Sequence, residues 1–296
     1  MKLKIRDSFH IYAIITIVFW AIAYVFTRMA LKYFSAYSLG FLRYFIASFI
    51  LIIVVIATKM KLPKKFDLKW FVLGGASGFF LYMISFNKGC ETVTASTSSV
   101  IIATVPIITS LLARFVYKER LKYYQWFAII ISFSGVIVLM LLDGIFSINK
   151  GLIWLILAAV LLSFYNLMQR KLTRTYSALQ ASAFSIFIGT IMLSIFSPIS
   201  LEEVKSAPGI QLFYVVVMGV FSSAIAYLAW SQAFAKSKYT SSVSNYMFIT
   251  PFLTTLLGLI IAKERPDFST IIGGIIILIG LLIFNFGGKF YVHKNK

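Results

Sequence analysis

The sequence predicts an all-α integral membrane protein with ten transmembrane helices, arranged as two inverted repeats of five helices each. The composition, the length of the apolar blocks and a duplicated segment support this prediction. Hydrophobic residues make up 60% of the 296 residues and charged residues only 12%, which is too few charges to cover a soluble domain of this size. The apolar residues come in blocks of about twenty, the length at which a helix crosses a hydrocarbon core of about 30 Å.

Charged residues and turn residues separate ten apolar blocks, each of which is a predicted membrane-spanning helix. The first block, from Ile11 to Leu31, is too long for the apolar part of a secretion signal, and no small-residue cleavage site ends it. We therefore count it as the first helix. The ten predicted helices cover residues 10–32, 36–58, 70–88, 93–117, 122–142, 151–170, 179–197, 209–233, 239–263 and 268–288.

The basic residues predict the orientation of the chain. Ten helices leave both termini on the same side of the membrane, and that side holds 20 of the 28 Lys and Arg residues. Because cytoplasmic loops carry an excess of Lys and Arg, we expect a multi-pass protein of the cell membrane with both termini in the cytoplasm. The net charge of +19 then reflects topology in a lipid bilayer, and we expect no nucleic-acid partner.

One segment of the sequence occurs twice, half a chain length apart. Thr104–Arg120 (TVPIITSLLARFVYKER) aligns with Ile249–Arg265 (ITPFLTTLLGLIIAKER) at an offset of 145 residues. The predicted repeats are residues 1–145 and 146–296, and because each has an odd number of helices, the second enters the membrane from the opposite side. Inverted repeats that exchange conformations open a central cavity to alternate sides, as in many secondary transporters. The alternative is a duplication that serves folding alone.

The sequence offers little for catalysis or for a cofactor. One cysteine (Cys90) and two histidines at opposite ends (His10 and His293) are too few for a metal site, and no G-x-x-x-x-G-K-[ST] loop occurs. We expect no catalytic residues, no metal and no cofactor. All nine acidic residues lie in predicted loops or at helix ends, so no carboxylate at the membrane midplane could relay protons. This favours facilitated diffusion or exchange and leaves the coupling open.

The two copies share a set of motif positions: a Ser/Thr-rich helix start, a proline within the helix, a glutamate at its end and a glycine-bearing final helix. These are Ala95-Ser96-Thr97-Ser98-Ser99, Pro106, Glu119, Gln125 and Gly135 in the first copy, and Thr240-Ser241-Ser242, Pro251, Glu264, Thr270, Gly273 and Gly280 in the second. The pattern resembles the EamA-type transporters of the drug/metabolite transporter superfamily over nearly the whole chain. The resemblance implies a ten-helix bundle that carries small metabolites, often exporting amino acids or related compounds.

Arg43 is the deepest basic residue in the outer half of the predicted bundle. It lies about seven residues, or roughly 10 Å, into the second helix, where a charge is costly unless it faces a cavity or a partner. It could hold a substrate carboxylate. Alternatively, it could extend to the surface or pair with a helix-end carbonyl or Glu91. Arg28, Lys32 and Lys88 lie nearer the outer surface, where extension of their side chains to the headgroups explains them better than an outer basic vestibule that attracts anions.

Aromatic and polar residues in the middle of the membrane form the predicted substrate site. Aromatic walls with a few hydrogen-bonding groups suit a small amphipathic solute, while helix packing and interfacial aromatic belts are the alternatives. Asn245, near the start of the ninth helix, has the largest hydrogen-bonding capacity in that stretch. The predicted substrate-binding residues are Trp20, Tyr24, Arg43, Tyr82, Tyr165, Asn166, Tyr227, Trp230 and Asn245.

Two prolines and two glutamates at equivalent positions are the predicted gating or structural residues. Pro106 and Pro251 each remove a backbone hydrogen bond and favour a kink, where a gate could bend or which packing could simply tolerate. Glu119 and Glu264 each end a helix between a Lys and an Arg. Each could form a local ion pair, or could clamp its loop to the neighbouring repeat.

The sequence therefore predicts a secondary transporter that moves a small metabolite across the cell membrane by alternating access. The family resemblance favours an amino acid or a related compound. The alternatives are a larger metabolite, such as a nucleoside-like or sulfonium compound, an integral-membrane enzyme, and a non-transporting sensor. We expect a small-molecule substrate, a lipid bilayer around the protein, and a monomer or a homodimer.

Overall fold

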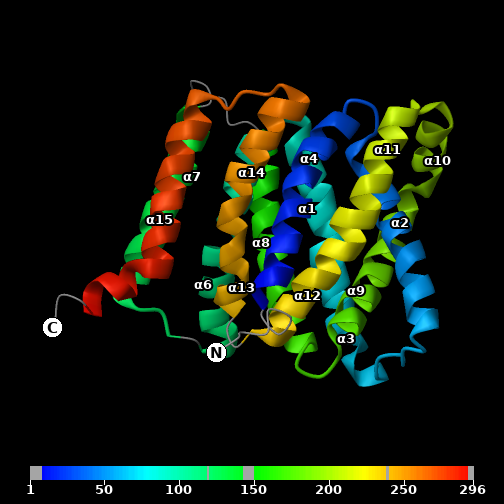
Figure 1. Ribbon diagram of the computed structural model, residues 1–296, viewed down its shortest axis with the longest axis horizontal. Helices are drawn as coiled ribbons and strands as arrows, with labels where there is room; N and C mark the ends of the chain where they lie inside the picture. The colour runs from blue at the N-terminus through cyan, green and yellow to red at the C-terminus, as the bar shows by residue number, and fades with distance from the viewer. Residues whose placement is uncertain (1–8, 119, 143–149, 238–239, 293–296) are drawn as a thin grey trace.

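The computed structural model describes residues 9–118, 120–142, 150–237 and 240–292, and over these residues the chain is helical and has no strand (Figure 1). Eight helical segments of this part of the chain are long and apolar enough to cross a membrane, and two further apolar helices are shorter. The segments follow the order of the ten predicted helices. The predicted all-α membrane fold is therefore confirmed.

Five of the ten segments are single helices: α1 (Phe9–Ala30), α2 (Ala36–Ala57), α7 (Tyr123–Leu142), α8 (Lys150–Leu172) and α15 (Phe268–Val292). The other five contain a break or a change of helix type. They are η2 (Lys65–Asp67) with α3 (Leu68–Gly75), η3 (Ala76–Leu81) and α4 (Tyr82–Thr92); α5 (Ala95–Ile102) with α6 (Val105–Tyr117); α9 (Ala178–Leu193) with η4 (Ser194–Phe196) and α10 (Ser197–Ser206); α11 (Gly209–Val217) with η5 (Met218–Ile225) and α12 (Ala226–Lys236); and α13 (Thr240–Ser244) with η6 (Asn245–Ile249), α14 (Thr250–Leu257) and η7 (Gly258–Ala262).

The seventh segment is longer than the sequence predicts. The predicted end at residue 197, just before Pro198, is wrong, because α9 continues through η4 into α10 and ends at Ser206. Pro198 lies in the first turn of α10. A proline is tolerated there, since the N–H that it lacks would have no partner within the helix.

Equivalent helices of the two repeats begin and end in the same way. Ser35 and Ser177, 142 residues apart, each cap a helix by accepting the backbone N–H three residues later. Lys118 and Lys263, 145 residues apart, each end a helix in the left-handed conformation, with φ of 55° and 54°. The third and eighth segments both contain a π-helical stretch, η3 and η5. These shared local structures fit two inverted copies of one unit.

Pro106 and Pro251 begin helices and do not lie inside them. α5 ends at Ile102, and α6 begins anew with Pro106 in its first turn. Pro251 lies in the first turn of α14, directly after the 3-10 helix η6. The predicted kinks are therefore breaks in the fourth and ninth segments, and their part in gating stays a prediction.

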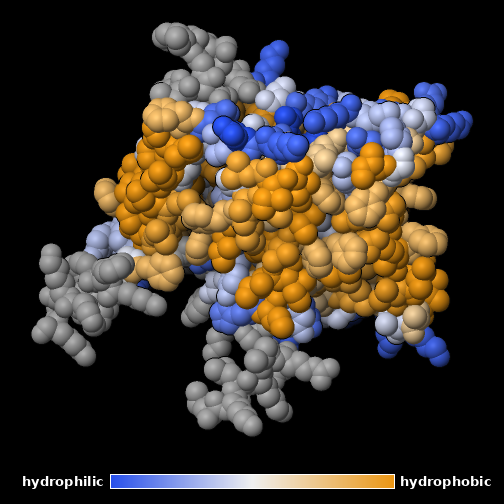
Figure 2. Space-filling view, turned by 45° about the horizontal axis from the view of Figure 1, so that its top comes forward, coloured by the Kyte–Doolittle hydropathy of each residue, from blue (hydrophilic) through white to orange (hydrophobic). Residues whose placement is uncertain are grey.

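The interior of the bundle lies between the two repeats. Figure 1 shows α7 and α15 side by side at one end of the molecule and α2, α9 and α10 at the other. Between them α4 packs on α8 and α1 on α12, so helices of the first repeat face helices of the second. Figure 2 shows a broad hydrophobic band on the outside, with hydrophilic residues gathered at its two edges, as a surrounding bilayer requires.

Candidate functional site

A small cavity of about 20 Å³ lies among buried residues of the two repeats. Five of the nine predicted substrate-binding residues line it: Trp20 and Tyr24 on α1, Arg43 on α2, Tyr82 on α4 and Tyr227 on α12. Their exposed fractions lie between 2% and 8%, so the cavity lies in the interior of the protein. The remaining lining residues are Ala23, Met83, Phe86, Ile102, Leu162 and Met247.

Arg43 is buried in this cavity without a carboxylate partner. Its side chain is 2% exposed. Its Nη1 donates to Thr27 Oγ1 at 3.4 Å and to Met83 Sδ at 3.7 Å, both long contacts, and its Nε has no hydrogen-bond partner. It neither reaches the surface nor pairs with Glu91, which within the described chain pairs with Lys88 at 3.0 Å. Among the described residues that line the cavity, Arg43 is the one charged group.

The lining residues Trp20 and Tyr227 belong to a cluster of aromatic rings. The ring of Trp20 lies 5.1 Å from Tyr227 and 5.0 Å from Trp230, measured between centroids. Phe79 lies 4.9 Å from Tyr227. Rings at these distances attract one another beyond their burial, which stabilises this cluster. Aromatic faces also attract cations.

Tyr165, Asn166 and Trp230 support this aromatic cluster. Trp230 Nε1 donates to Asn166 Oδ1 at 3.0 Å, and Asn166 Nδ2 donates to Thr109 Oγ1 at 3.3 Å. Tyr165 packs on Tyr227 with its centroid 5.7 Å away. The structure thus brings these three next to the cavity but not into its lining.

Asn245 lies apart from the other predicted site residues. It lines a second and larger hollow, together with His10 on α1 and Phe286 on α15, and its Oδ1 is buried without a hydrogen-bond partner. Its distance from the cavity follows from the break after α13, where η6 directs Met247 inward. In this structure Asn245 does not line the cavity that contains Arg43, and its part in substrate binding stays a prediction.

The apolar residues of the lining were not predicted from the sequence. Met83, Phe86 and Met247 line the cavity, yet their spacing and chemistry equal those of any apolar residue on a membrane helix. One feature of the sequence could have indicated two of them: Met83 and Phe86 follow the predicted site residue Tyr82 on the same helix.

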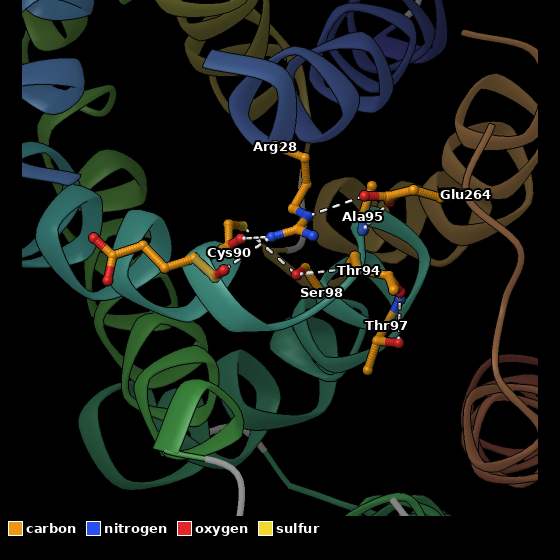
Figure 3. A network of polar contacts seen from close by, with 8 residues as sticks. Arg28, Cys90, Thr94, Ala95, Thr97, Ser98 and Glu264 are labelled. Atoms are coloured by element: carbon orange, nitrogen blue, oxygen red, sulfur yellow. Dashed lines mark hydrogen bonds and ion pairs between the residues drawn. The ribbon is translucent and has the colours of Figure 1, made fainter. Parts of the chain in front are cut away.

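Glu264 connects the two repeats through contacts with Arg28 and Ala95 (Figure 3). Its Oε1 lies 3.1 Å from Arg28 Nε, and its Oε2 accepts the backbone N–H of Ala95 at 3.0 Å. In the described chain its ion-pair partner is thus an arginine of the other repeat and not the adjacent Lys263 or Arg265. Arg28 is held in this pair and does not extend to the surface as expected. Glu119, the equivalent glutamate, lies outside the described residues.

The chain matches a known transporter family in both of its halves. Residues 8–141 and residues 149–286 each match the EamA-like transporter family. A solved crystal structure of 18% identity has the same fold, with a TM-score of 0.61 over 91% of this chain and 95% of the other.

Relatives from several organisms are similar along most of their length. The "Uncharacterized transporter YdfC" of Bacillus subtilis is 29% identical over 88% of this chain and 86% of its own. The "Probable terminal-alkyne amino-acid exporter" of Streptantibioticus cattleyicolor is 26% identical over 92% and 91%. The "S-adenosylmethionine uptake transporter" of Rickettsia prowazekii is 24% identical over 86% and 84%.

Proposed function

Because this chain belongs to the EamA-like transporter family, we propose that it is a secondary transporter of small amphipathic metabolites that carry a carboxylate group. An amino acid or a close relative is the substrate. It crosses the cell membrane by alternating access between two inverted repeats, residues 1–145 and 146–296, with both termini in the cytoplasm. One chain supplies both repeats and a whole cavity, so a monomer suffices.

The unpaired charge of Arg43 carries this proposal. Burial of a guanidinium that lacks a carboxylate partner or a full set of hydrogen bonds costs free energy. Arg43 makes two long hydrogen-bond contacts, and its Nε has no hydrogen-bond partner. A substrate carboxylate would offset that cost, because guanidinium and carboxylate form two parallel charge-assisted hydrogen bonds. Binding of a substrate carboxylate therefore accounts for the buried charge of Arg43, whereas helix packing does not require a charge there.

The rest of the lining suits the other parts of such a molecule. Trp20, Tyr24 and Tyr227 offer aromatic faces on which an ammonium group can rest. Met83 and Phe86 offer apolar contacts for a side chain. The cavity itself measures about 20 Å³, well below the volume of a ligand pocket, so a substrate enters only when the two repeats move apart.

The names of two relatives agree with this chemistry. One is named as an amino-acid exporter and the other as an uptake transporter of S-adenosylmethionine, and both of these solutes carry an amino-acid carboxylate. S-adenosylmethionine adds a sulfonium cation, which aromatic faces also accept. It is the second candidate and needs a cavity that opens further.

The charge of Arg43 also favours exchange over one-way flow. When the cavity is closed and empty, the buried guanidinium lacks an anion, whereas a bound carboxylate neutralises it. The closed state through which the protein must pass is therefore more accessible with substrate bound. We expect labelled amino acid to enter liposomes preloaded with unlabelled amino acid at least about tenfold faster than empty ones, for a difference of about 1.4 kcal/mol.

The test is counterflow by the purified protein in liposomes that contain mixed unlabelled amino acids, with and without a proton gradient. Uptake of a labelled amino acid in the absence of a gradient is the expected result. Protein-free liposomes and Lys88→Gln, at an exposed ion pair outside the cavity, are the controls. If no amino acid enters under either condition, the amino-acid proposal is wrong, and S-adenosylmethionine and nucleosides follow in the same liposomes.

A further inference from the structure

Four elements meet at the ion pair between Arg28 and Glu264. Besides Glu264, Arg28 contacts the end of α4, where its Nη1 donates to the carbonyl oxygens of Cys90 at 2.6 Å and Glu91 at 3.0 Å. Glu264 follows η7 of the second repeat and also holds the start of α5 through Ala95. The contacts therefore tie α1, α4 and α5 of the first repeat to the second.

The backbone conformation at the end of η7 places Glu264 next to the start of α5. Lys263 ends η7 in the left-handed conformation with φ 54°, which turns the chain at the residue before Glu264. The carboxylate then meets the first N–H of α5, where a negative charge is favoured by the helix dipole. Thr94 caps the same helix by accepting the N–H of Thr97 at 3.2 Å. The start of α5 is thus capped by one group from each repeat (Figure 3).

This ion pair lies one helical turn from the cavity on two helices. Arg28 follows the cavity residue Tyr24 by four positions on α1, and Cys90 follows the cavity residue Phe86 by four positions on α4. Four residues rise about 6 Å. Arg28 and Glu264 are also largely covered, with 22% and 18% of their side chains exposed. The pair therefore covers the cavity at its nearer end.

We propose that Arg28, Glu264 and the start of α5 form a gate that closes the cavity on this face, and that the Arg28–Glu264 pair breaks when this face opens. The proposal rests on the proposed function in one respect, that a solute reaches the cavity. The other ion pair of the described chain, Lys88 with Glu91, lies three residues apart within α4. This pair lies within one helix and joins neither α1 nor α5 to the second repeat, although Lys88 Nζ also lies 5.0 Å from the ring centre of Tyr37 on α2. It therefore provides the matched control.

The thiol of Cys90 can report on the opening of this gate. Cys90 is the single cysteine of the chain and is fully buried, with its Sγ 3.5 Å from Ser98 Oγ on α5. Separation of α5 from α4 and Arg28 exposes this thiol. A hydrophilic maleimide that reacts with protein in nanodiscs, where both faces are accessible, therefore measures opening without knowledge of orientation or substrate.

Glu264→Gln is expected to raise the rate of Cys90 labelling about tenfold, because it removes a charge-assisted hydrogen bond while the amide oxygen still accepts from Ala95. Arg28→Gln and the double variant complete a mutant cycle. If the two residues act as a pair, the double variant reacts no faster than the faster single variant. Lys88→Gln is expected to react at the wild-type rate.

Thermal unfolding of each variant separates gate opening from loss of the fold. A variant that reacts faster while it unfolds at the wild-type temperature supports the gate. Wild-type labelling rates in folded Glu264→Gln, additive effects in the double variant, or equal acceleration by Lys88→Gln would each overturn it. Because the readout is a thiol and not a flux, a failed gate and a failed transport proposal give different results.

Discussion

Arg43→Gln is expected to lower the rate of amino-acid counterflow by about 100-fold, since charge-assisted hydrogen bonds to a carboxylate contribute up to about 3 kcal/mol. Glutamine fills part of the space of the arginine but offers neither its charge nor its two parallel donors. Arg43→Lys keeps the positive charge but loses the two parallel N–H donors of the guanidinium, so a counterflow rate between those of the wild type and Arg43→Gln is expected.

The same substitution is expected to leave the thermal stability of the protein unchanged or to raise it. Removal of a buried charge that has no carboxylate partner relieves a desolvation cost, and Arg43 makes two long contacts in the described structure. A residue kept for packing behaves in the opposite way: its loss lowers stability and changes transport only through folding. Near-normal counterflow with a lower unfolding temperature would show that Arg43 is structural.

Gly280→Ala is expected to destabilise the protein by about 1–3 kcal/mol, the cost of overpacking a close contact. A Cβ at Gly280 on α15 would lie 2.8 Å from the backbone oxygen of Ala128 and would overlap Ser132 Oγ on α7. Backbone atoms cannot move aside as a side chain can. The two helices would have to separate, at the contact where they pack side by side (Figure 1).

The inverted repeat supplies a second variant with the same expected effect. Gly135 on α7 is the equivalent of Gly280, and a Cβ there would lie 2.9 Å from the backbone oxygen of Gly273. Gly274→Ala is the control on the same helix as Gly280, because its Cβ would meet Val100 at an ordinary 3.4 Å. The measurement is thermal unfolding in detergent. Equal unfolding temperatures for Gly280→Ala and Gly274→Ala would contradict the close contact.

The ten-helix fold could be predicted because its signals are local. A membrane helix needs about twenty apolar residues, and the duplicated segment shows the repeat directly. The breaks inside the segments could not be predicted in this way. Pro106 and Pro251 are predicted within continuous helices, but the regular α-helix is interrupted just before each of them, so that each proline lies in the first turn of a new helix. Pro198 shows the reverse error, since its segment continues past it.

The charged part of the candidate site was within reach of the sequence, and the apolar part was not. Arg43 stands out because a charge deep in the membrane demands an explanation. Met83 and Met247 do not stand out, because nothing local separates a cavity-lining methionine from one that packs. The pairing of Arg28 with Glu264 joins residues 236 positions apart, which helical spacing cannot relate.

The central claim is that the cavity recognises a carboxylate, and competition between matched pairs of solutes tests it most directly. Each pair is an amino acid and the amine left when its carboxylate is removed, such as leucine with isopentylamine and phenylalanine with phenethylamine. These compounds compete against the labelled amino acid in counterflow by the wild-type protein. The account predicts that the amino acids inhibit and that the amines do not, at concentrations up to about 100-fold higher, the factor expected from the lost contact. Equal inhibition by the amines would contradict the role of Arg43 and the proposed substrate class.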